Sequence, residues 1–317
     1  FQRLVDAPHG MSDHPTSPLE VAMIPHRLSL VIVLALLAPA CDDDDGGGQN
    51  DAAPGQDATP GQDAGPGQDA GPGSDAAIWA PTTGTTWHIQ YSGLPVDTTV
   101  DVAIYNLDLE DTEATLIASL HAAGRRIQCY FSAGSYEDWR LDEGDFPADV
   151  IGTAMDGWPG ESWLDVRHAG LRPIMEARLD LAVTKGCDGV DPDNVNGYTN
   201  DTGFPLTYAD QLAYNQWLAD EAHARGLAIG LKNDVEQIAD LEPFFEWALN
   251  EECLTYAECD LMAPFIASGK PVFHLEYVDL AADGPARLAE VCGDPTITGF
   301  STLVKIWDLD AWFLACD

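Results

Sequence analysis

The feature that most constrains the fold is a series of short apolar runs, rich in β-branched and aromatic residues, that begins at Trp87 and continues to Ile306. Most runs are followed by a stretch with helical periodicity, an alternation typical of βα units in a parallel sheet. The pattern predicts eight strands, near Trp87–Tyr91, Val102–Leu107, Arg126–Phe131, Gly189–Pro192, Ala228–Leu231, Trp247–Asn250, Pro271–Leu275 and Gly299–Ile306. Eight such strands predict an α/β fold, closed as a (β/α)8 TIM-type barrel.

Helical periodicity is clearest in the segments Thr112–Ala123, Pro173–Lys185 and Tyr208–Arg225. A glycine stands directly after each of these segments, at Gly124, Gly186 and Gly226. Glycine adopts the left-handed conformation with which helices commonly end, so these positions support three helices between predicted strands.

Two segments depart from the regular barrel pattern. Ser92–Asp101, between the first two predicted strands, is too short for a crossover helix, so we predict a degenerate first helix. Gly134–Leu171 is a long insert after the third strand, and it contains Trp139, Trp158 and Trp163. We expect an insert of this length to fold over the mouth of the barrel.

Composition divides the 317-residue chain into a non-globular N-terminal part and one domain. Residues 42–77 repeat Pro, Gly, Gln and Asp and have too little apolar surface to bury, which predicts a disordered linker. Residues 78–317 have the length of a single barrel domain. Residues 1–22 carry no recognisable pattern and are interpreted as upstream sequence translated in error, since Met23 is a natural start.

Residues 23–41 resemble a secretory signal, because His26-Arg27 precedes an apolar stretch that is too short to span a membrane. Cys41 follows Ala38-Pro39-Ala40, where a bacterial lipoprotein signal places its acylated cysteine, although Ala38 stands where leucine is usual. We therefore predict an exported lipoprotein, at the cell surface or in the periplasm, whose lipid anchor at Cys41 attaches it to the membrane. Plain signal-peptidase cleavage, which gives an extracellular protein, is the alternative.

The six cysteines after Cys41 suit an oxidising compartment. Cys253 and Cys259 are close enough for a short loop disulfide, and Cys292 with Cys316 can tie the last helix to the C-terminus. The remaining two, Cys129 and Cys187, look like strand residues that can stay reduced. No C-x-x-C spacing is present, which weighs against a structural metal.

The formal net charge of -39, with only 14 Lys and Arg, argues against nucleic acid as a partner, since phosphate binding needs clustered cations. A cationic or neutral ligand fits this charge better. The alternative is that the acidic surface serves solubility alone, and the aspartates of residues 42–77 add to the total without belonging to any site.

Polar and charged residues end most of the predicted strands, and in a TIM-type barrel the active site lies at these ends. They are Asp108, Asp191, Asp193, Asn194, Lys232, Asn233, Asp234, Glu251, Glu276, Tyr277 and Asp308. A ring of partly buried carboxylates around one mouth points to function. For any single residue, a salt bridge or a helix N-cap is the structural alternative.

A pair of carboxylates can hydrolyse a glycosidic bond, with one group donating a proton to the leaving oxygen and the other attacking carbon or activating water. We predict Asp193 and Glu251 as this pair, from the fourth and sixth strands. Asp191 is the second choice for the catalytic aspartate in place of Asp193, because both side chains point to the same side of the strand. The sequence leaves open which residue attacks, and whether configuration is retained or inverted.

Several separated motifs, in order, resemble the endo-α-1,4-polygalactosaminidase family, glycoside hydrolase family 114. They are Cys129–Arg140 (CYFSAGSYEDWR), Trp163–Arg167 (WLDVR), Asp188–Tyr198 (DGVDPDNVNGY), Gly230–Asp234 (GLKND) and Asn250–Cys253 (NEEC). The resemblance extends from about Trp87 to about Tyr277. It implies a barrel enzyme that cleaves α-1,4-linked galactosamine polymers, with its catalytic aspartate and glutamate at Asp193 and Glu251.

The chain departs from the family pattern at Asp191, where glutamate is more common, and at Asn196, where aspartate is more common. These changes bear on substrate preference more than on the reaction. A cationic galactosamine polymer agrees with the acidic composition. A barrel that binds carbohydrate without turnover, and a hydrolase of a different glycan, are the competing hypotheses.

Beside the catalytic pair, we predict a set of substrate-binding residues. They are Tyr91, Asp108, Tyr130, Asp191, Asn194, Lys232, Asn233 and Glu276, with Tyr136 and Trp307 as further stacking platforms and Arg167 as a further cation. No histidine pair with a carboxylate at metal spacing and no glycine-rich phosphate loop is present in the sequence, so no cofactor or metal is expected. We expect a monomer.

Overall fold

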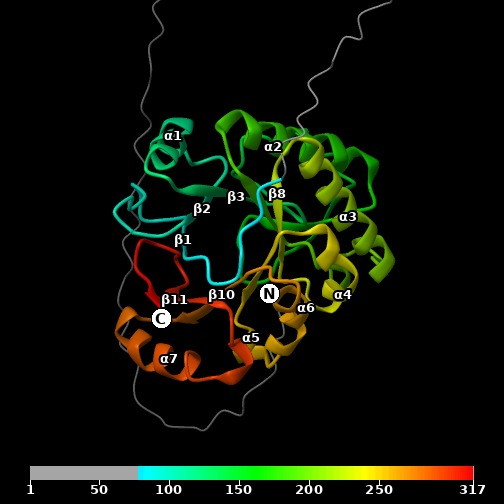
Figure 1. The fold of residues 1–317 in the computed structure, drawn as a ribbon. Helices are drawn as coiled ribbons and strands as arrows, with labels where there is room; N and C mark the ends of the chain where they lie inside the picture. Colours follow the sequence, from blue (N-terminus) through cyan, green and yellow to red (C-terminus); the bar gives the residue numbers. More distant parts are fainter. Residues whose placement is uncertain (1–77, 317) are drawn as a thin grey trace, which may run out of the picture. The chain divides into compact units, whose positions relative to one another are not determined.

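A computed structural model of the chain describes residues 78–316 (Figure 1). The predictions for residues 1–22, 23–41 and 42–77, including the lipid anchor at Cys41, lie outside the described residues. In the part that is described, no helix has the length and apolar character needed to cross a membrane.

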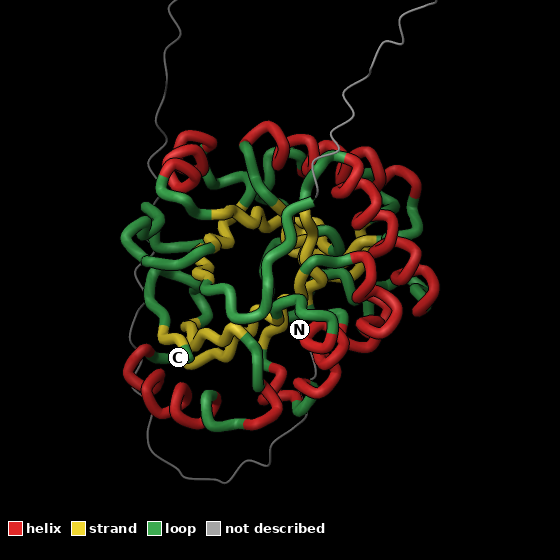
Figure 2. Tube along the Cα trace, viewed as in Figure 1, coloured by secondary structure: helices red, strands yellow, loops and turns green. Residues whose placement is uncertain are grey.

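All eight predicted strands are present and lie in one sheet as parallel neighbours. They are β1 (Trp87–Gln90), β2 (Ile104–Asp108), β3 (Arg126–Ser132), β7 (Gly189–Asp193), β8 (Ala228–Lys232), β9 (Trp247–Glu251), β10 (Val272–Val278) and β11 (Ser301–Ile306). A ninth strand, β12 (Leu314–Ala315), pairs antiparallel with β11. The sheet curls into a ring with the helices outside it (Figure 2), which confirms the TIM-type barrel.

The seam of the ring lies between β1 and β11, where side chains take the place of a backbone ladder in the described part of the chain. The indole of Trp87 donates to the Ser301 carbonyl at 2.9 Å, and the ammonium of Lys305 donates to the Ile89 carbonyl at 3.0 Å. The lysine side chain is fully buried, and burial lowers its pKa to about 8. These two bonds tie β1 to β11 across the seam.

Trp247 fills the inner layer of the barrel together with Trp87 and Phe273. Its indole occupies space that only glycine leaves free on the neighbouring strands. A Cβ atom at Gly230 would lie 1.9 Å from the indole nitrogen of Trp247, and one at Gly189 would lie 2.7 Å from its ring. The large residue on β9 therefore requires the small residues on β7 and β8.

The helices pack on the outside of the ring. They are α1 (Ala114–Ala122), α2 (Arg172–Lys185), α3 (Tyr208–Ala224), α4 (Ile238–Leu241), α5 (Cys253–Tyr256), α6 (Ala263–Ala267) and α7 (Gly284–Val291). The first three are the predicted helices, and Gly124, Gly186 and Gly226 beyond them are left-handed. No helix forms between β1 and β2, so the degenerate first helix is confirmed.

The insert after β3 forms a three-stranded antiparallel sheet that the sequence analysis did not predict. Its strands are β4 (Ser135–Glu137), β5 (Ile151–Ala154) and β6 (Glu161–Leu164), in the order β4-β6-β5. Arg178 of α2 holds the insert through Asp142, at 2.8 Å. Arg140 holds it through Asp108 of β2, at 3.0 Å. The insert is thus fixed to the barrel by buried ion pairs.

Three disulfides are formed among the described residues. The predicted pairs Cys253–Cys259 and Cys292–Cys316 are confirmed. The prediction that Cys129 and Cys187 can stay reduced is wrong, because they form a disulfide with a Cα–Cα distance of 6.0 Å. Cys187 ends the turn into β7 and Cys129 lies on β3, so their proximity depends on the β3–β7 pairing, 58 residues apart in sequence.

Candidate active site

Neighbouring parallel strands deliver five polar side chains to one end of the barrel. Tyr130 comes from β3, Asp193 from β7, Lys232 from β8, Glu251 from β9 and Tyr277 from β10. In each strand these side chains alternate with ones that face the helices, so they point to the inside. All five line one pocket, whose empty volume is about 850 Å³ and includes space open to solvent.

Lys232 lies between the two predicted catalytic carboxylates. Its Nζ is 2.8 Å from Asp193 Oδ2 and 3.4 Å from Glu251 Oε2. Burial alone would lower the pKa of this lysine, but the carboxylates of Asp193, Glu251 and Asp191 outweigh burial and raise it above its ordinary value. Lys232 therefore stays charged and holds two like-charged groups close together.

Glu251 accepts hydrogen bonds on both of its oxygens. The Tyr277 hydroxyl donates to Oε1 at 2.5 Å, and Asn233 Nδ2 donates to Oε2 at 2.7 Å. Burial, and then the charge of Glu251, raise the pKa of Tyr277 well above its ordinary value, so the phenol keeps its proton. Asn233 Oδ1 also accepts from the Glu251 backbone N–H at 2.9 Å, which fixes the carboxylate from both sides.

Left-handed residues follow three of the catalytic strands. Asn194, Asn233 and Glu252 have φ of 61°, 53° and 63° and come directly after Asp193, Lys232 and Glu251. Asparagine tolerates this conformation better than most residues, and strained backbone is concentrated at functional sites. Asn194 and Asn233 line the pocket, whereas Glu252 does not.

The aromatic residues form two stacks at this mouth. Tyr91 and Tyr130 have ring centroids 4.5 Å apart, and Lys232 Nζ lies 5.1 Å from the Tyr130 ring centroid. Tyr277 and Trp307 are nearly parallel, with centroids 4.4 Å apart. All four rings line the pocket and give it apolar walls of the kind on which sugar rings stack.

Asp191, the second choice for the catalytic aspartate, is fully buried and is not among the residues that line the pocket. It accepts from Asn106 Nδ2 at 3.0 Å, while its Oδ1 has no hydrogen-bond partner among residues 78–316. Burial raises its pKa to about 6, although Lys232 opposes this shift. Asp191 thus lies outside the pocket and influences it electrostatically, because its carboxyl group interacts with the charge of Lys232.

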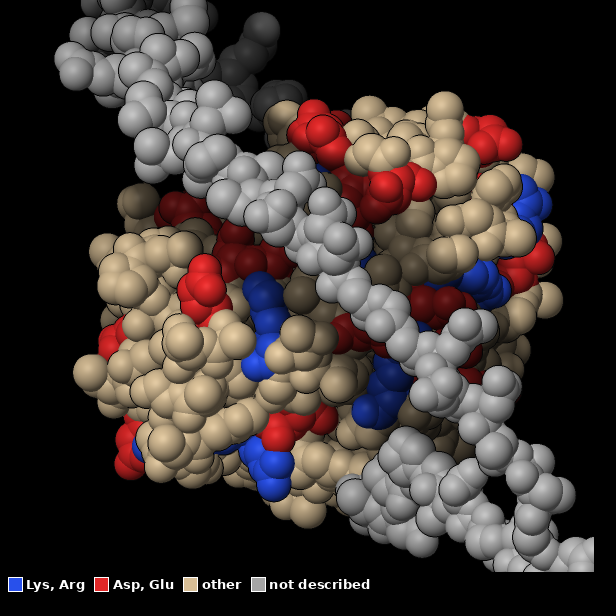
Figure 3. Space-filling model, turned by 90° about the horizontal axis from the view of Figure 1, so that it is seen from above, with Lys and Arg blue, Asp and Glu red and all other residues tan. Residues whose placement is uncertain are grey.

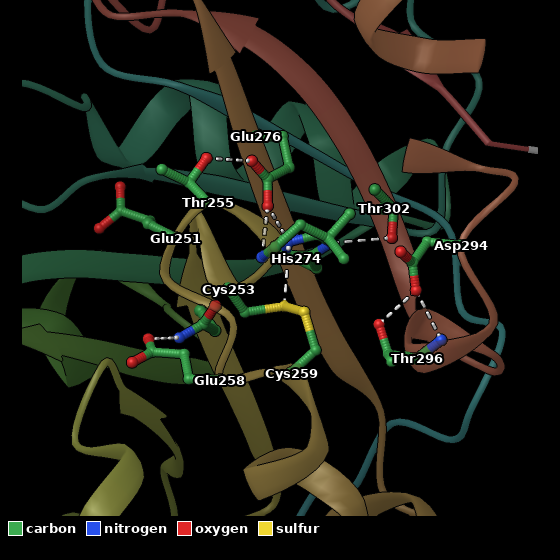
Figure 4. Close-up of a disulfide and its surroundings, with 12 residues drawn as sticks. Glu251, Cys253, Thr255, Glu258, Cys259, His274, Glu276, Asp294, Thr296 and Thr302 are labelled. Carbon is green, nitrogen blue, oxygen red and sulfur yellow. Dashed lines mark hydrogen bonds and ion pairs between the residues drawn. A yellow bond between two sulfur atoms is a disulfide. The ribbon is translucent and has the colours of Figure 1, made fainter. Parts of the chain in front are cut away.

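Two predicted substrate-binding residues lie elsewhere. Glu276 faces α5 and α7, where Leu254 N donates to it at 2.9 Å and Arg287 Nη2 pairs with it. Figure 4 shows Glu276 bonded to Thr255 and His274. Asp108 bonds Arg140 at 2.9 Å. Glu276 is next to Tyr277 on one strand, so alternation sends it to the opposite face. Neither residue lines the pocket.

The other predicted residues also divide into those that line the pocket and those that lie elsewhere. Tyr91, Tyr130, Asn194, Lys232 and Asn233 line the pocket with Asp193 and Glu251, as do Tyr277, Trp307 and Asp308. Tyr136 packs against Phe146, Arg167 pairs with Asp165, and Asp234 is buried against Asn215. The set brought together is therefore the inward-facing one.

The insert contributes a wall to the pocket at the mouth of the barrel, where its length predicted it to fold, but the sequence analysis named none of its wall residues as binding residues. Met155, Trp158 and Glu161 line the pocket, as does Asn196. The concentration of tryptophan in the insert was the one available signal for this wall. Nothing in the sequence singled out Glu161, because it belongs to a strand that forms only when the insert folds onto the barrel.

One group of metal-type ligands exists among the described residues, at Cys253, Cys259 and His274, whose ligand atoms lie within 4.8 Å of one another. The two sulfurs are joined in a disulfide, and the imidazole bonds Glu276 at 3.0 Å (Figure 4). Thiolates, the form in which cysteine binds metal, are therefore not available there.

Basic side chains do not gather on the face drawn in Figure 3, where Lys and Arg form small groups between acidic residues. Phosphate backbones are bound by continuous basic surfaces. The charge on this face is therefore in keeping with the expectation that nucleic acid is not the partner.

The chain resembles two solved structures. Aspergillus fumigatus Ega3, solved in complex with galactosamine, is 45% identical with a TM-score of 0.72, covering 76% of this chain and 98% of Ega3. The glycoside hydrolase domain of PelA from Pseudomonas aeruginosa is 12% identical, with a TM-score of 0.58, over 73% of this chain and 98% of that domain. PelA shares the fold.

Sequence comparison gives the same family. An uncharacterised protein of Deinococcus radiodurans is 27% identical over an alignment of length 208, which covers 58% of this chain and 67% of that protein. The model of glycoside-hydrolase family GH114 matches residues 68–317, well over half of the chain. With its two carboxylates at the mouth of a TIM-type barrel, the chain belongs to glycoside-hydrolase family GH114 and is a glycoside hydrolase.

Proposed function

We propose that this enzyme hydrolyses α-1,4 linkages within a galactosamine polymer, with Asp193 and Glu251 as its catalytic residues. The observation that carries the proposal is the placement of both carboxylates around one ammonium group in an open pocket. The similarity to Ega3, solved with galactosamine, supports the choice of sugar.

We assign the attack on the anomeric carbon to Asp193 and the proton transfer to Glu251. The ammonium of Lys232 is closer to Asp193 than to Glu251, so attraction favours negative charge on Asp193. An Asp193 oxygen forms a bond to the anomeric carbon as the glycosidic C–O bond breaks, and Glu251 donates its proton to the leaving oxygen. Water then displaces Asp193 from the sugar and returns a proton to Glu251.

This two-step reaction retains the configuration of the sugar. The two distances to Lys232 limit the gap between Asp193 Oδ2 and Glu251 Oε2 to about 6 Å. Retaining enzymes have carboxyl groups about 5–5.5 Å apart and inverting ones about 6.5–9.5 Å. The limit on this one pair of oxygens allows the retaining separation, and the anomer released first, followed by proton NMR, tests retention.

The decisive experiment is the release of reducing ends from soluble oligogalactosamine by the wild type, Asp193→Asn and Glu251→Gln. Both variants should lose at least a hundredfold in kcat with unchanged melting temperature. Glu143→Gln, an exposed residue of the insert, is the matched control. Near-wild-type rates in either catalytic variant contradict the assignment. Binding of the polymer without new reducing ends from the wild type favours a carbohydrate-binding protein instead.

We also propose that the enzyme is exported and tethered as a monomer, with a lipid on Cys41 and residues 42–77 as the spacer. The basic and apolar segments before Cys41 support export. The three disulfides of the described part fit an oxidising compartment. Cys41→Ser should release the protein from the membrane fraction, and labelling with a fatty-acid analogue should be lost with it.

A further inference from the structure

Glu161 places a carboxylate in the pocket from the side of the insert. It is the first residue of β6 and lines the pocket beside Trp158, near Asp193 of the barrel. Only 8% of its surface is exposed. The catalytic assignment above gives this side chain no part.

One oxygen of Glu161 is bound by the protein and the other is not. Ser135 Oγ donates to Oε2 at 2.9 Å, and no hydrogen bond to Oε1 occurs within residues 78–316. No ion pair reaches Glu161 in this part of the chain either, because the nearby Arg140 is taken up by Glu137 and Asp108. A buried carboxylate without a cation is costly, so this group has room for a positively charged partner.

We propose that Glu161 binds the ammonium group of an amino sugar in this pocket and thereby selects free amines over neutral sugars. The inference rests on the proposed substrate. An ammonium supplies hydrogen-bond donors and the charge that Glu161 lacks, and a neutral hydroxyl at the same carbon supplies a donor without the charge. An N-acetylated sugar loses the positive charge as well.

The surroundings of Glu161 strengthen this assignment. Burial raises its pKa to about 7, the carboxylates of Glu137 on β4 and Asp193 on β7 add to the rise, and Ser135 and Arg140 oppose it. Without ligand, the group is therefore close to half protonated at neutral pH. A bound cation favours the ionised form, so binding is coupled to the loss of a proton.

The alternative role is structural, because Ser135 joins Glu161 to the catalytic strand. Asn194 Nδ2 donates to Ser135 Oγ at 3.1 Å, and Asn194 follows Asp193 directly. Glu161→Gln separates the two roles. The amide oxygen still accepts from Ser135 and preserves this chain of hydrogen bonds, while the charge is removed.

The test is titration calorimetry of the full chain with galactosamine and with galactose at neutral pH. Wild type should prefer galactosamine, and Glu161→Gln should weaken galactosamine binding by about tenfold or more while galactose binding is unchanged. Glu161→Asp should recover part of the preference, and Glu143→Gln should behave as wild type. Equal weakening for both sugars, or none for galactosamine, overturns the inference.

The dependence on pH gives a second readout. Galactosamine affinity of the wild type should fall as the pH decreases through about 7, because Glu161 takes up a proton. The Glu161→Gln variant should lack this fall. If the fall persists unchanged in the variant, the titrating group is another residue and the inference is wrong.

Failure of this inference differs from failure of the proposed function. If the wild type cleaves oligogalactosamine and Glu161→Gln cleaves it with unchanged KM, the function stands and the role of Glu161 is wrong. If the wild type cleaves no galactosamine polymer but loses its amine preference in Glu161→Gln, the binding role stands and the proposed reaction is wrong.

Discussion

The ammonium nitrogen of Lys232 lies 2.8 Å from the carboxylate of Asp193 in a position where only 3% of the lysine side chain is exposed. The same nitrogen is 3.4 Å from Glu251. Two carboxyl groups that share one pocket repel each other when both carry charge, and this shared cation reduces the cost of holding them close together. Lys232 is thus part of the proposed catalytic arrangement.

Lys232→Met should lower kcat by at least a hundredfold and the free energy of unfolding by about 3 kcal/mol, because the buried carboxylate of Glu251 and the partly buried one of Asp193 lose their partner. The stability loss should shrink as the pH falls and the carboxylates are protonated. Urea unfolding at pH 7 and pH 5, with kinetics on oligogalactosamine, measures both effects. A variant with wild-type kcat contradicts this role.

Tyr277→Phe removes the hydroxyl that donates to Glu251 and keeps the ring that stacks on Trp307. We expect kcat to fall by about 10- to 100-fold, since a short bond to a charged group contributes roughly 1.5–3 kcal/mol. Trp307→Ala, the matched variant, should raise KM more than it lowers kcat. Steady-state kinetics distinguishes these patterns. Identical effects of the two changes would contradict separate roles for the Tyr277 hydroxyl in catalysis and the Trp307 ring in sugar binding.

Gly230→Ala should unfold or strongly destabilise the protein, by about 3 kcal/mol or more, because the new Cβ overlaps the Trp247 indole at 1.9 Å. Gly124→Ala is the control, since Gly124 has a φ of +80° but nothing within 4 Å of an added Cβ. It should cost only about 1–2 kcal/mol. Denaturant unfolding of both variants gives the comparison, and equal losses contradict the packing argument.

His88 predicts acid sensitivity of the fold. Burial, and then the charge of Lys305, lower its pKa to about 4, below the ordinary 6.5. The folded state therefore binds fewer protons than the unfolded state between these values. The contribution of neutral His88 is complete above about pH 6.5 and is lost as the pH falls toward 4. Wild type should lose about 2 kcal/mol more than His88→Phe between pH 7 and pH 5, measured by urea unfolding.

Removing the Cys129–Cys187 disulfide by a double serine substitution should cost about 4 kcal/mol, since it closes a loop across 58 residues. The same change at Cys253 and Cys259, 6 residues apart, should cost about 2 kcal/mol. Thermal unfolding checks the order of the two. The opposite order would mean that native-state packing around the sulfurs outweighs the entropy of the unfolded chain.

A site residue was predictable from the sequence where the pattern of its own strand was enough to show which way its side chain points. Asp193, Lys232 and Glu251 end apolar runs, and alternation along each run sends them inward. The same rule, applied only to strand ends, also selected Glu276, which alternation turns away from the pocket, and Asp108, which shares the inward face with Tyr130 but pairs with Arg140 of the insert. Register within the strand, rather than position at its end, decides which face a side chain takes.

By itself, the sequence determined the eight strands, the barrel and the two catalytic candidates, because hydrophobic periodicity and strand-end chemistry are local properties. Only the tertiary structure decided the Cys129–Cys187 disulfide, the cation shared by the two carboxylates and the presence of Glu161 in the pocket wall. Each of these depends on contacts between segments far apart in the chain. Such contacts exist only after the strands have paired and the insert has packed against the barrel.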